Sequence, residues 1–381
     1  MSGRGTAVAI ERAAAYTTAM SNENRDEPGG AASRGAWLAL ACAIALTAAV
    51  LARSLGGELV YDDLWLVARN PALESWDSLA SGLGASHWEF VEPDTALRIG
   101  YWRPLAILGL FVARHAGGGD PWAFHALSLA CHLASVALVF LLVRAWLGER
   151  RVLAATAAAL VFGLHPVQVE SVSWISALND PLAGCLLLGA LLAFVRWRRR
   201  GSNGWPIAAT ACFAVALLAK ESALAALLLV PIADWVTRAE KRPLLRAYAP
   251  ALGVLAAYWI ARATVFGEAL GGLDRVTSYL HESALRQVTL RVELLGGSLA
   301  LLAWPAKLNL FREVRPEIPW SDAQLWIAAL ALAIWLAALA VAHKRRNRLV
   351  VGALLFSLAA FAPAALRYES IGRFPLSERF L

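Results

Sequence analysis

The stretch FHALSLACHLASVALVFLLV (residues 124–143) is a run of apolar and small residues that ends at the basic residues Arg144, Arg150 and Arg151. One bilayer crossing needs roughly 20 such residues in a helix, so the stretch predicts a membrane-spanning helix. The pattern recurs along the chain of 381 residues, 59% of which are hydrophobic. A soluble domain rarely carries so much apolar content. We predict an all-α, polytopic integral membrane protein.

The predicted spans are the apolar runs 36–52, 124–143, 152–164, 174–195, 205–219, 222–236, 248–266, 325–342 and 349–365. For the first run a cleaved signal peptide is the alternative, but the long polar segment 1–34 before it favours an uncleaved helix after a disordered cytoplasmic tail. The run 285–303 is amphipathic in its first half. We therefore expect it to be a re-entrant or interfacial helix and not a span.

The net charge of +7 does not indicate a nucleic-acid partner, because the basic residues gather at the ends of apolar runs. Arg196, Arg198, Arg199 and Arg200 form the densest cluster. The positive-inside rule places that cluster in the cytoplasm. The four cysteines fall inside apolar runs, where they act as small hydrophobic residues. Neither a metal-binding Cys/His spacing nor a phosphate-binding glycine loop occurs in the sequence.

A long polar connection, residues 54–123, follows the first span and begins the predicted transmembrane domain 35–381. It contains nine acidic residues against four basic ones, which suits the outer side of the membrane. Its segment Pro104–Ala113 is apolar but too short to be a regular span. Near its start, two adjacent carboxylates, Asp62 and Asp63, lie between hydrophobic residues. We hypothesise that one of them is a general base, and an ordinary solvated loop is the alternative.

Other ionisable residues fall where the predicted topology puts them at membrane depth, on the same side as the aspartates. Such groups are costly unless they are paired, and they often mark functional sites. They include Asp180 inside an apolar run and Lys220-Glu221 in a very short link. The alternatives are structural: Lys220 and Glu221 could pair with each other, and His165-Pro166 could simply end a helix.

These residues form an ordered set of motifs: Asp62-Asp63 with Asn70-Pro71, Tyr101-x-Arg103-Pro104-Leu105, Phe124-His125 with His132, His165-Pro166 to Glu170, Trp174-Ile-Ser with Asn179-Asp180, Lys220-Glu221, and Ser377-Glu378-Arg379-Phe380. The set resembles the membrane part of the transmembrane, tetratricopeptide-associated O-mannosyltransferases and their bacterial relatives, which are glycosyltransferases of the GT-C class. The resemblance covers roughly residues 55–381. It implies a GT-C-like helix bundle whose long first outer loop carries the acidic motif.

The resemblance also implies a reaction. A sugar, with mannose as the candidate, would move from a polyprenyl- or dolichyl-phosphate donor to a hydroxyl acceptor, such as a protein Ser or Thr or a glycan, with inversion. Asp62 would be the base, with Asp63 as its neighbour, and the donor phosphate would contact Arg103, Lys220 and Arg379. Five residues would orient these groups or bind the sugar or acceptor: Tyr101, His165, Glu170, Asp180 and Glu221. The sequence requires no cofactor; a divalent metal ion stays open as an alternative, although nothing in the sequence supports one.

Two departures from the family pattern leave other functions open. Ala177-Leu178-Asn179-Asp180 lacks the basic residue that relatives often have before the aspartate, and tetratricopeptide repeats are absent from the sequence. A lipid-linked sugar flippase or transporter and an inactive membrane scaffold are the alternative functions. Residue usage rich in Ala, Arg and Leu favours a bacterial inner membrane with a periplasmic active face. The ending at Leu381, without a closing helix, leads us to expect a fragment of a longer protein.

Overall fold

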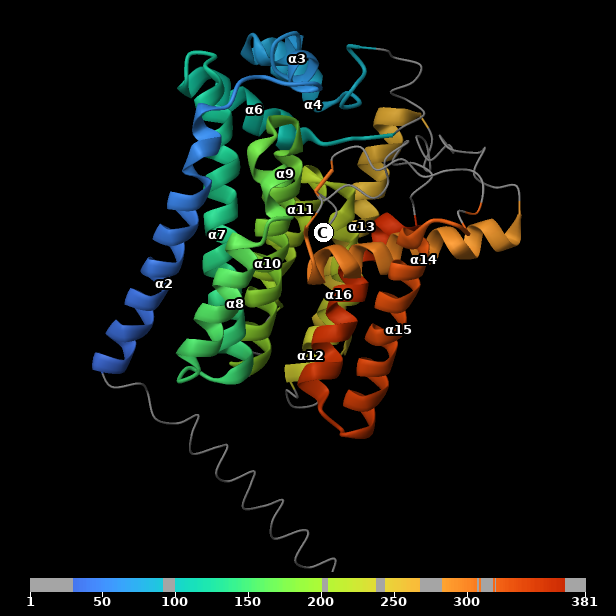
Figure 1. Ribbon diagram of the computed structural model, residues 1–381. Coiled ribbons are helices and arrows are strands. Elements are labelled where there is room, and N and C mark those ends of the chain that lie inside the picture. The colour runs from blue at the N-terminus through green and yellow to red at the C-terminus, as the bar shows by residue number, and fades with distance from the viewer. Residues whose placement is uncertain are drawn as a thin grey trace, which may run out of the picture.

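The structure is a computed structural model of the chain, and it describes residues 30–91, 100–200, 205–237, 244–267, 283–306, 308–309, 318 and 320–366. The described residues form helices, turns and loops and include no strand. Figure 1 shows a bundle of helices that run side by side, with a layer of short helices across one end. The protein is therefore an all-α polytopic membrane protein, as predicted.

The bundle is made of helices whose bounds follow the apolar runs closely. Its members are α2 (Gly30–Leu51), α7 (Pro121–Leu147), α8 (Val152–Leu164), α10 (Asn179–Arg199), α11 (Ile207–Ala219), α12 (Ala226–Thr237), α13 (Leu244–Phe266), α15 (Ala323–Lys344) and α16 (Arg348–Leu366). Five helical segments are long and apolar enough to cross a membrane, namely Ser33–Gly56, Pro121–Leu147, Ile175–Arg199, Arg246–Phe266 and Ala323–Lys344. Helix α2 begins at Gly30, so the end of the segment predicted as a tail is helical. Residues 1–29 lie outside the described residues.

The cap, as we call residues 57–91 and 100–116, covers one end of the bundle (Figure 1). It contains the short helices α3 (Asp63–Leu66), η2 (Pro71–Leu73), α4 (Trp76–Leu83) and α6 (Pro104–Ala116). Leu73 of the cap and Phe124 of α7 are fully buried in one apolar core. Burial of such side chains contributes roughly 1.5–3 kcal/mol each, so the cap is a packed layer and not a solvated loop.

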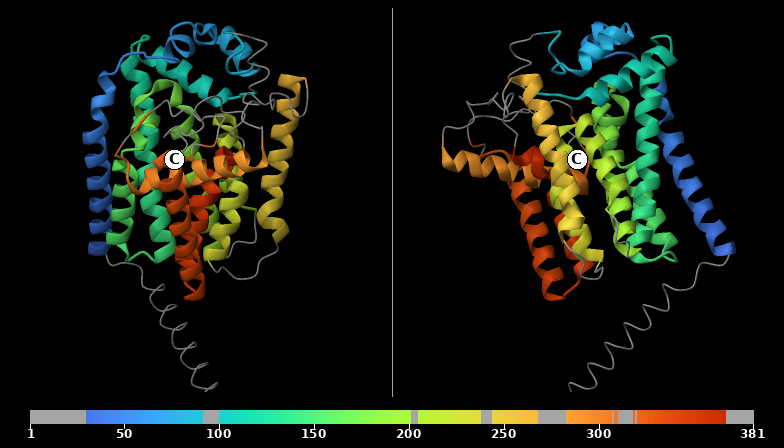
Figure 2. Two further views of the ribbon diagram at one scale, coloured as in Figure 1. Left: turned by 45° about the vertical axis from the view of Figure 1, so that its right-hand side comes forward. Right: turned by 180° about the vertical axis from the view of Figure 1, so that it is seen from behind.

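The basic turn between α15 and α16, which includes Arg345 and Arg346, lies at the end of the bundle opposite the cap, as does the turn between α7 and α8 (Figure 1). Helix α14 (Ala284–Ala303) lies crosswise to its neighbours instead of alongside them (Figure 2). Because α14 does not run the length of the bundle, the turn between α15 and α16 lies at the end opposite the cap. It packs on α15 where Gly296 faces Ala328: a Cβ at Gly296 would come within 1.9 Å of the Ala328 carbonyl oxygen. This orientation agrees with the prediction that 285–303 is not a regular span.

One predicted span is interrupted. Residues 174–195 were expected to form a single helix, but Trp174 is extended and the chain passes through a short turn, η3 (Ile175–Ala177), before α10 begins at Asn179. The sequence is compatible with this start, because Pro181 falls in the first turn of α10, where a missing N–H costs no helical hydrogen bond. The interruption places Ser176, Asn179 and Asp180 beneath the cap.

Candidate functional site

A small polar cavity lies between the cap and the neighbouring ends of α10 and α11. Its volume is about 70 Å³, and it is lined by Asp62, Leu66, His87, Trp88, Tyr101, Arg103, Trp174, Ser176, Ala177, Asn179, Asp180 and Lys220. Five of the predicted site residues therefore come together here, from segments that are far apart in the sequence. This cavity is small compared with the roughly 300–1,000 Å³ of typical ligand pockets, so binding of a sugar requires it to widen.

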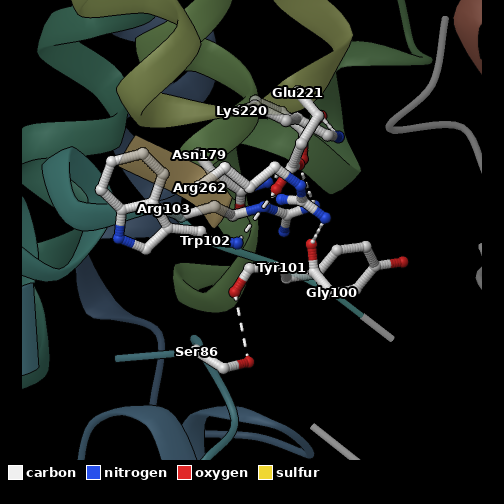
Figure 3. Close-up of polar contacts among 10 residues, drawn as sticks. Ser86, Gly100, Tyr101, Trp102, Arg103, Asn179, Lys220, Glu221 and Arg262 are labelled. Atoms are coloured by element: carbon white, nitrogen blue, oxygen red, sulfur yellow. Dashed lines mark hydrogen bonds and ion pairs between the residues drawn. The ribbon is translucent and has the colours of Figure 1, made fainter. Parts of the chain in front are cut away.

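Arg103 is held by the carboxylate of Glu221 at the start of η4 (Glu221–Ala225). Its Nε and Nη2 atoms both donate to Oε2 at 3.1 Å, while the backbone N–H of Trp102 donates to Oε1 at 3.2 Å (Figure 3). The guanidinium also stacks over the ring of Tyr101, with 4.1 Å between its carbon and the ring centroid. The sequence analysis assigned Arg103 to the donor phosphate and Glu221 to orienting the reacting groups, and it did not predict that the two side chains pair with each other.

Lys220 forms a second buried ion pair, with Asp180 in the first turn of α10. The two side chains are 7% and 11% exposed. Lys220 itself has an extended backbone that separates α11 from η4, which turns its side chain toward the cavity. Lys220 and Glu221 therefore do not form an ion pair with each other, which was the structural alternative for this motif. Each contacts a different partner.

The two tandem aspartates have different environments. Asp62 is half-buried and lines the cavity. Asp63 is fully buried, and its carboxylate accepts from the Val60 N–H at 3.1 Å, the Ser176 N–H at 2.8 Å and the Ser176 hydroxyl at 2.5 Å. Burial raises the pKa of Asp63 above its ordinary value, although the hydrogen bonds from Ser176 and Val60 oppose this shift. Asp63 therefore ties the cap to η3 and holds its neighbour in place.

The residue before this pair, Tyr61, has a left-handed backbone with φ of 52°. A bulky residue rarely adopts this region, and such strain of about 1–3 kcal/mol clusters at functional sites. The Tyr61 ring lies 6.2 Å from the ring of Trp174, which lines the cavity. The strained turn and this aromatic contact direct the Asp62 side chain toward the site.

Two helix ends add positive electrostatic potential. Arg103 is the N-cap of α6, and α10 begins at Asn179. The first N–H groups of a helix carry a partial positive charge that favours anions. With its amide oriented to satisfy both neighbours, Asn179 accepts from Arg103 Nη1 at 3.2 Å and donates to the Ser176 carbonyl at 2.9 Å. The site therefore combines two cations and two helix N-termini around a potential base.

Three residues that the sequence analysis did not select support this site. His87 is buried, and its backbone N–H donates to the Tyr101 carbonyl at 2.7 Å. Burial and the nearby charge of Arg103 lower the pKa of His87 to about 3. Arg262 of α13 donates from Nη2 to the Gly100 carbonyl at 2.6 Å and so holds the approach to Arg103 (Figure 3). Ser176 is the third, and it stands in the Trp174-Ile-Ser motif, although no role was assigned to it. His87 and Arg262 have no sequence signal of their own, because each works through a non-local contact.

Other predicted residues lie elsewhere. His165 bonds through Nε2 to the Leu302 carbonyl at 3.0 Å and thereby caps the end of α14. Glu170, on α9 (Gln168–Ser173), is half-buried and does not line this cavity. Arg379 lies outside the described residues. Within the described part of the chain, no group of three His, Cys, Asp or Glu side chains is placed to hold a metal ion.

Comparison with known proteins identifies relatives. The chain is 32% identical over 198 residues to Protein O-mannosyl-transferase Tmtc1 of Drosophila melanogaster, which is 51% of this chain and 22% of that protein. It is 33% identical over 189 residues to Tmtc2 of the same fly (48% and 20%), and 33% identical over 177 residues to human TMTC1 (45% and 19%). No family model and no solved structure matches the chain. The matched segment spans only about a fifth of the length of these relatives. Across about half of its own length, the chain is homologous to proteins named protein O-mannosyl-transferases.

Proposed function

We propose that this chain is a membrane glycosyltransferase that moves a sugar from a polyprenyl- or dolichyl-phosphate donor to a hydroxyl acceptor at the cap side of the membrane. The observation that carries the proposal is the cavity itself: Asp62, the partly buried Arg103 and the buried Lys220 line one space at the edge of an apolar bundle. A base, phosphate-binding cations and a nearby bilayer are the three elements that this chemistry requires. The names of the relatives support the same class of reaction.

The chemistry is a displacement at the anomeric carbon. The acceptor hydroxyl attacks this carbon, its proton passes to the Asp62 carboxylate, and the bond to the phosphate oxygen breaks. The polyprenyl phosphate leaves with an additional negative charge, and the configuration inverts. Fixed charges that stabilise the leaving group lower the barrier without reorganising in the transition state. Arg103 is suited to bind the phosphate through a planar set of donors, and Lys220 through a point charge.

The charges of the site explain why donor binding must rearrange it. Arg103 and Lys220 each face a carboxylate, and with Asp62 the described groups carry one more negative than positive charge. A phosphate therefore competes with Glu221 and Asp180 for the two cations. Arg379, which the sequence analysis assigns to the phosphate, would supply a third cation. No step of this mechanism calls on a metal ion.

Orientation follows from the basic turns. The positive-inside rule places the end with Arg199 and Arg345 in the cytoplasm, so the cap faces the opposite side. In a bacterial inner membrane that side is the periplasm. We propose the protein acceptors of the relatives, with Ser or Thr hydroxyls, as the first acceptors to test and mannose as the first sugar.

The test uses the purified chain in lipid nanodiscs with polyprenyl-phosphate mannose and a Ser/Thr peptide. We expect release of polyprenyl phosphate, and Asp62→Asn should lower the rate by about 10²–10⁴-fold because it removes the general base. Glu58→Gln is the matched control, since Glu58 is an exposed carboxylate of the same loop. Unchanged transfer by the Asp62→Asn variant, with membrane insertion intact, would exclude Asp62 from the mechanism. Movement of the donor across vesicles without bond cleavage would support a transporter instead.

A further inference from the structure

A second cavity, which the proposed reaction has not used, lies on the cap beside the first one. Its volume is about 520 Å³, within the range of typical ligand sites. The lining includes Ser78, Ser81 and Gly82 on one face of α4, with Asn70, His87 and Glu89 around them. His87 lines both cavities, so the two are adjacent.

The walls of this cavity suit a polypeptide backbone. Along α4 the lining residues are small and lie at positions three and four apart, so they share one face. Gly82 packs against Ala72, so the hydroxyls of Ser78 and Ser81 are the groups that this face offers to a ligand. Asn70 and His87 are 3% and 4% exposed, and each has a nitrogen, Nδ2 and Nδ1, with no partner within the described residues. The Asn70 amide is oriented by the Ala72 N–H, which donates to Oδ1 at 3.0 Å, so its Nδ2 remains a donor. Buried polar atoms without partners are rare in native proteins and point to a missing ligand.

The charge of the second cavity separates it from the first. Among the described residues that line it, Glu89 is the only charged one, and its Oε2 accepts from the Ser86 N–H at 2.9 Å. The first cavity offers two cations, Arg103 and Lys220, to a phosphate that displaces their carboxylate partners, whereas the described lining of the second cavity offers a phosphate no cation. The donor and the acceptor of a transfer reaction therefore have separate sites, and His87 lines both.

We propose that this second cavity binds the acceptor polypeptide, in an extended conformation, with its Ser or Thr hydroxyl reaching past His87 toward Asp62. The proposal rests on the proposed function for the identity of the reaction, but the binding itself can be measured alone. Backbone groups of the bound segment pair with Asn70 and His87, and extended peptides are commonly held through such main-chain contacts. Glu89 makes the cavity prefer neutral or basic segments over acidic ones.

The experiment measures binding of a short fluorescein-labelled peptide of Ser, Thr, Ala and Gly to the full chain in nanodiscs, by fluorescence anisotropy. Ser81→Trp fills the cavity from an exposed position of α4, and Ala80→Trp is the matched control on another face of the same helix. We expect Ser81→Trp to weaken binding by at least about tenfold and Ala80→Trp by less than about twofold, because a cavity-filling side chain blocks only the site it occupies. Glu residues in the peptide should weaken binding to the wild type, and Glu89→Gln should reverse that loss.

Failures of the two proposals can be told apart. Equal affinities of the two Trp variants, or no saturable binding to the wild type, would overturn the peptide site. If the wild type releases polyprenyl phosphate while Ser81→Trp leaves the KM for the peptide unchanged, the transferase stands and the peptide site does not. If the peptide binds with the expected pattern but no lipid-linked sugar is cleaved, the peptide site stands and the transferase fails. Displacement of the peptide by a free oligosaccharide would show that the cavity takes a glycan instead, and would overturn the proposal.

Discussion

Arg103 and Glu221 are 118 residues apart in the sequence, yet two nitrogens of the Arg103 guanidinium donate to one carboxylate oxygen of Glu221 at 3.1 Å. The pair joins the cap to the break between α11 and α12. Both side chains are largely buried, at 11% and 24% exposure. The pair therefore sets the relative position of the two parts of the protein that carry the candidate site.

Removing one member of this pair should destabilise the protein strongly. Glu221→Ala leaves the Arg103 charge buried without its partner, a change that typically costs about 3–5 kcal/mol. Thermal unfolding in detergent would show this as a large drop in Tm. Glu58→Ala is the control: Glu58 is an exposed carboxylate of the cap, and surface substitutions of this kind usually change stability by no more than about 0.5 kcal/mol. Equal drops would mean that the Arg103 pair has no special structural role.

The Lys220–Asp180 pair allows stability and function to be separated. Lys220→Met alone should lower Tm, because it leaves the Asp180 carboxylate without its cation. In the double variant Lys220→Met/Asp180→Asn both charges are gone, and most of the lost stability should return. Affinity for polyprenyl phosphate, measured by titration, should stay low in both variants. Recovery of phosphate affinity in the double variant would contradict a phosphate-binding role for Lys220.

The contact between Ser176 and Asp63 should matter more for catalysis than for the fold. Ser176→Ala removes the hydroxyl that donates to Asp63 at 2.5 Å but keeps the backbone donor at 2.8 Å. Loss of one buried hydrogen bond to a charged group costs about 1.5–3 kcal/mol. We expect kcat to fall, with a smaller effect on the KM for the donor, since Asp62 is then less well positioned. Ser176→Thr keeps the hydroxyl and should rescue kcat; a failure to do so would argue against the positioning role.

The stability of the protein should depend on pH through His87. Its pKa is about 3 in the folded protein and about 6.5 in an unfolded chain. The stabilisation is therefore fully present above pH 6.5 and is lost as the pH falls toward 3, at up to about 1.4 kcal/mol per pH unit. Wild-type Tm should fall between pH 7 and pH 5 by more than the Tm of His87→Gln. Parallel pH profiles of the two proteins would show that His87 is not held neutral.

The helices could be predicted from the sequence because long apolar runs encode them locally. The run 124–143 became α7, and the break at Lys220-Glu221 was found where the apolar pattern stops. The pairings could not be predicted, because Arg103–Glu221 and Lys220–Asp180 depend on which helices become neighbours. A sequence pattern shows that a buried charge needs a partner but does not say which partner it has.

The tandem aspartates show the same limit at close range. Sequence analysis could select Asp62 and Asp63 together, but only packing distinguishes the residue that lines the cavity from the one that Ser176 satisfies. His165 was selected as part of the His165-Pro166 to Glu170 motif, and its partner, the Leu302 carbonyl, lies 137 residues away in the sequence. His87 was missed because no local pattern marks a histidine that lines two cavities.

The close contact between Gly296 of α14 and the Ala328 backbone of α15 has a mechanical consequence. It couples α14 to α15, while six residues further along α14 the Leu302 carbonyl is bonded to His165, which follows α8. A thicker or thinner bilayer changes the tilt of spanning helices at a modest energetic cost. Through this linkage, a tilt of α15 would shift α14 and strain its attachment to His165. We therefore expect turnover to vary with the acyl-chain length of the surrounding lipid, and Gly296→Ala, which forces the two helices apart, to alter that dependence.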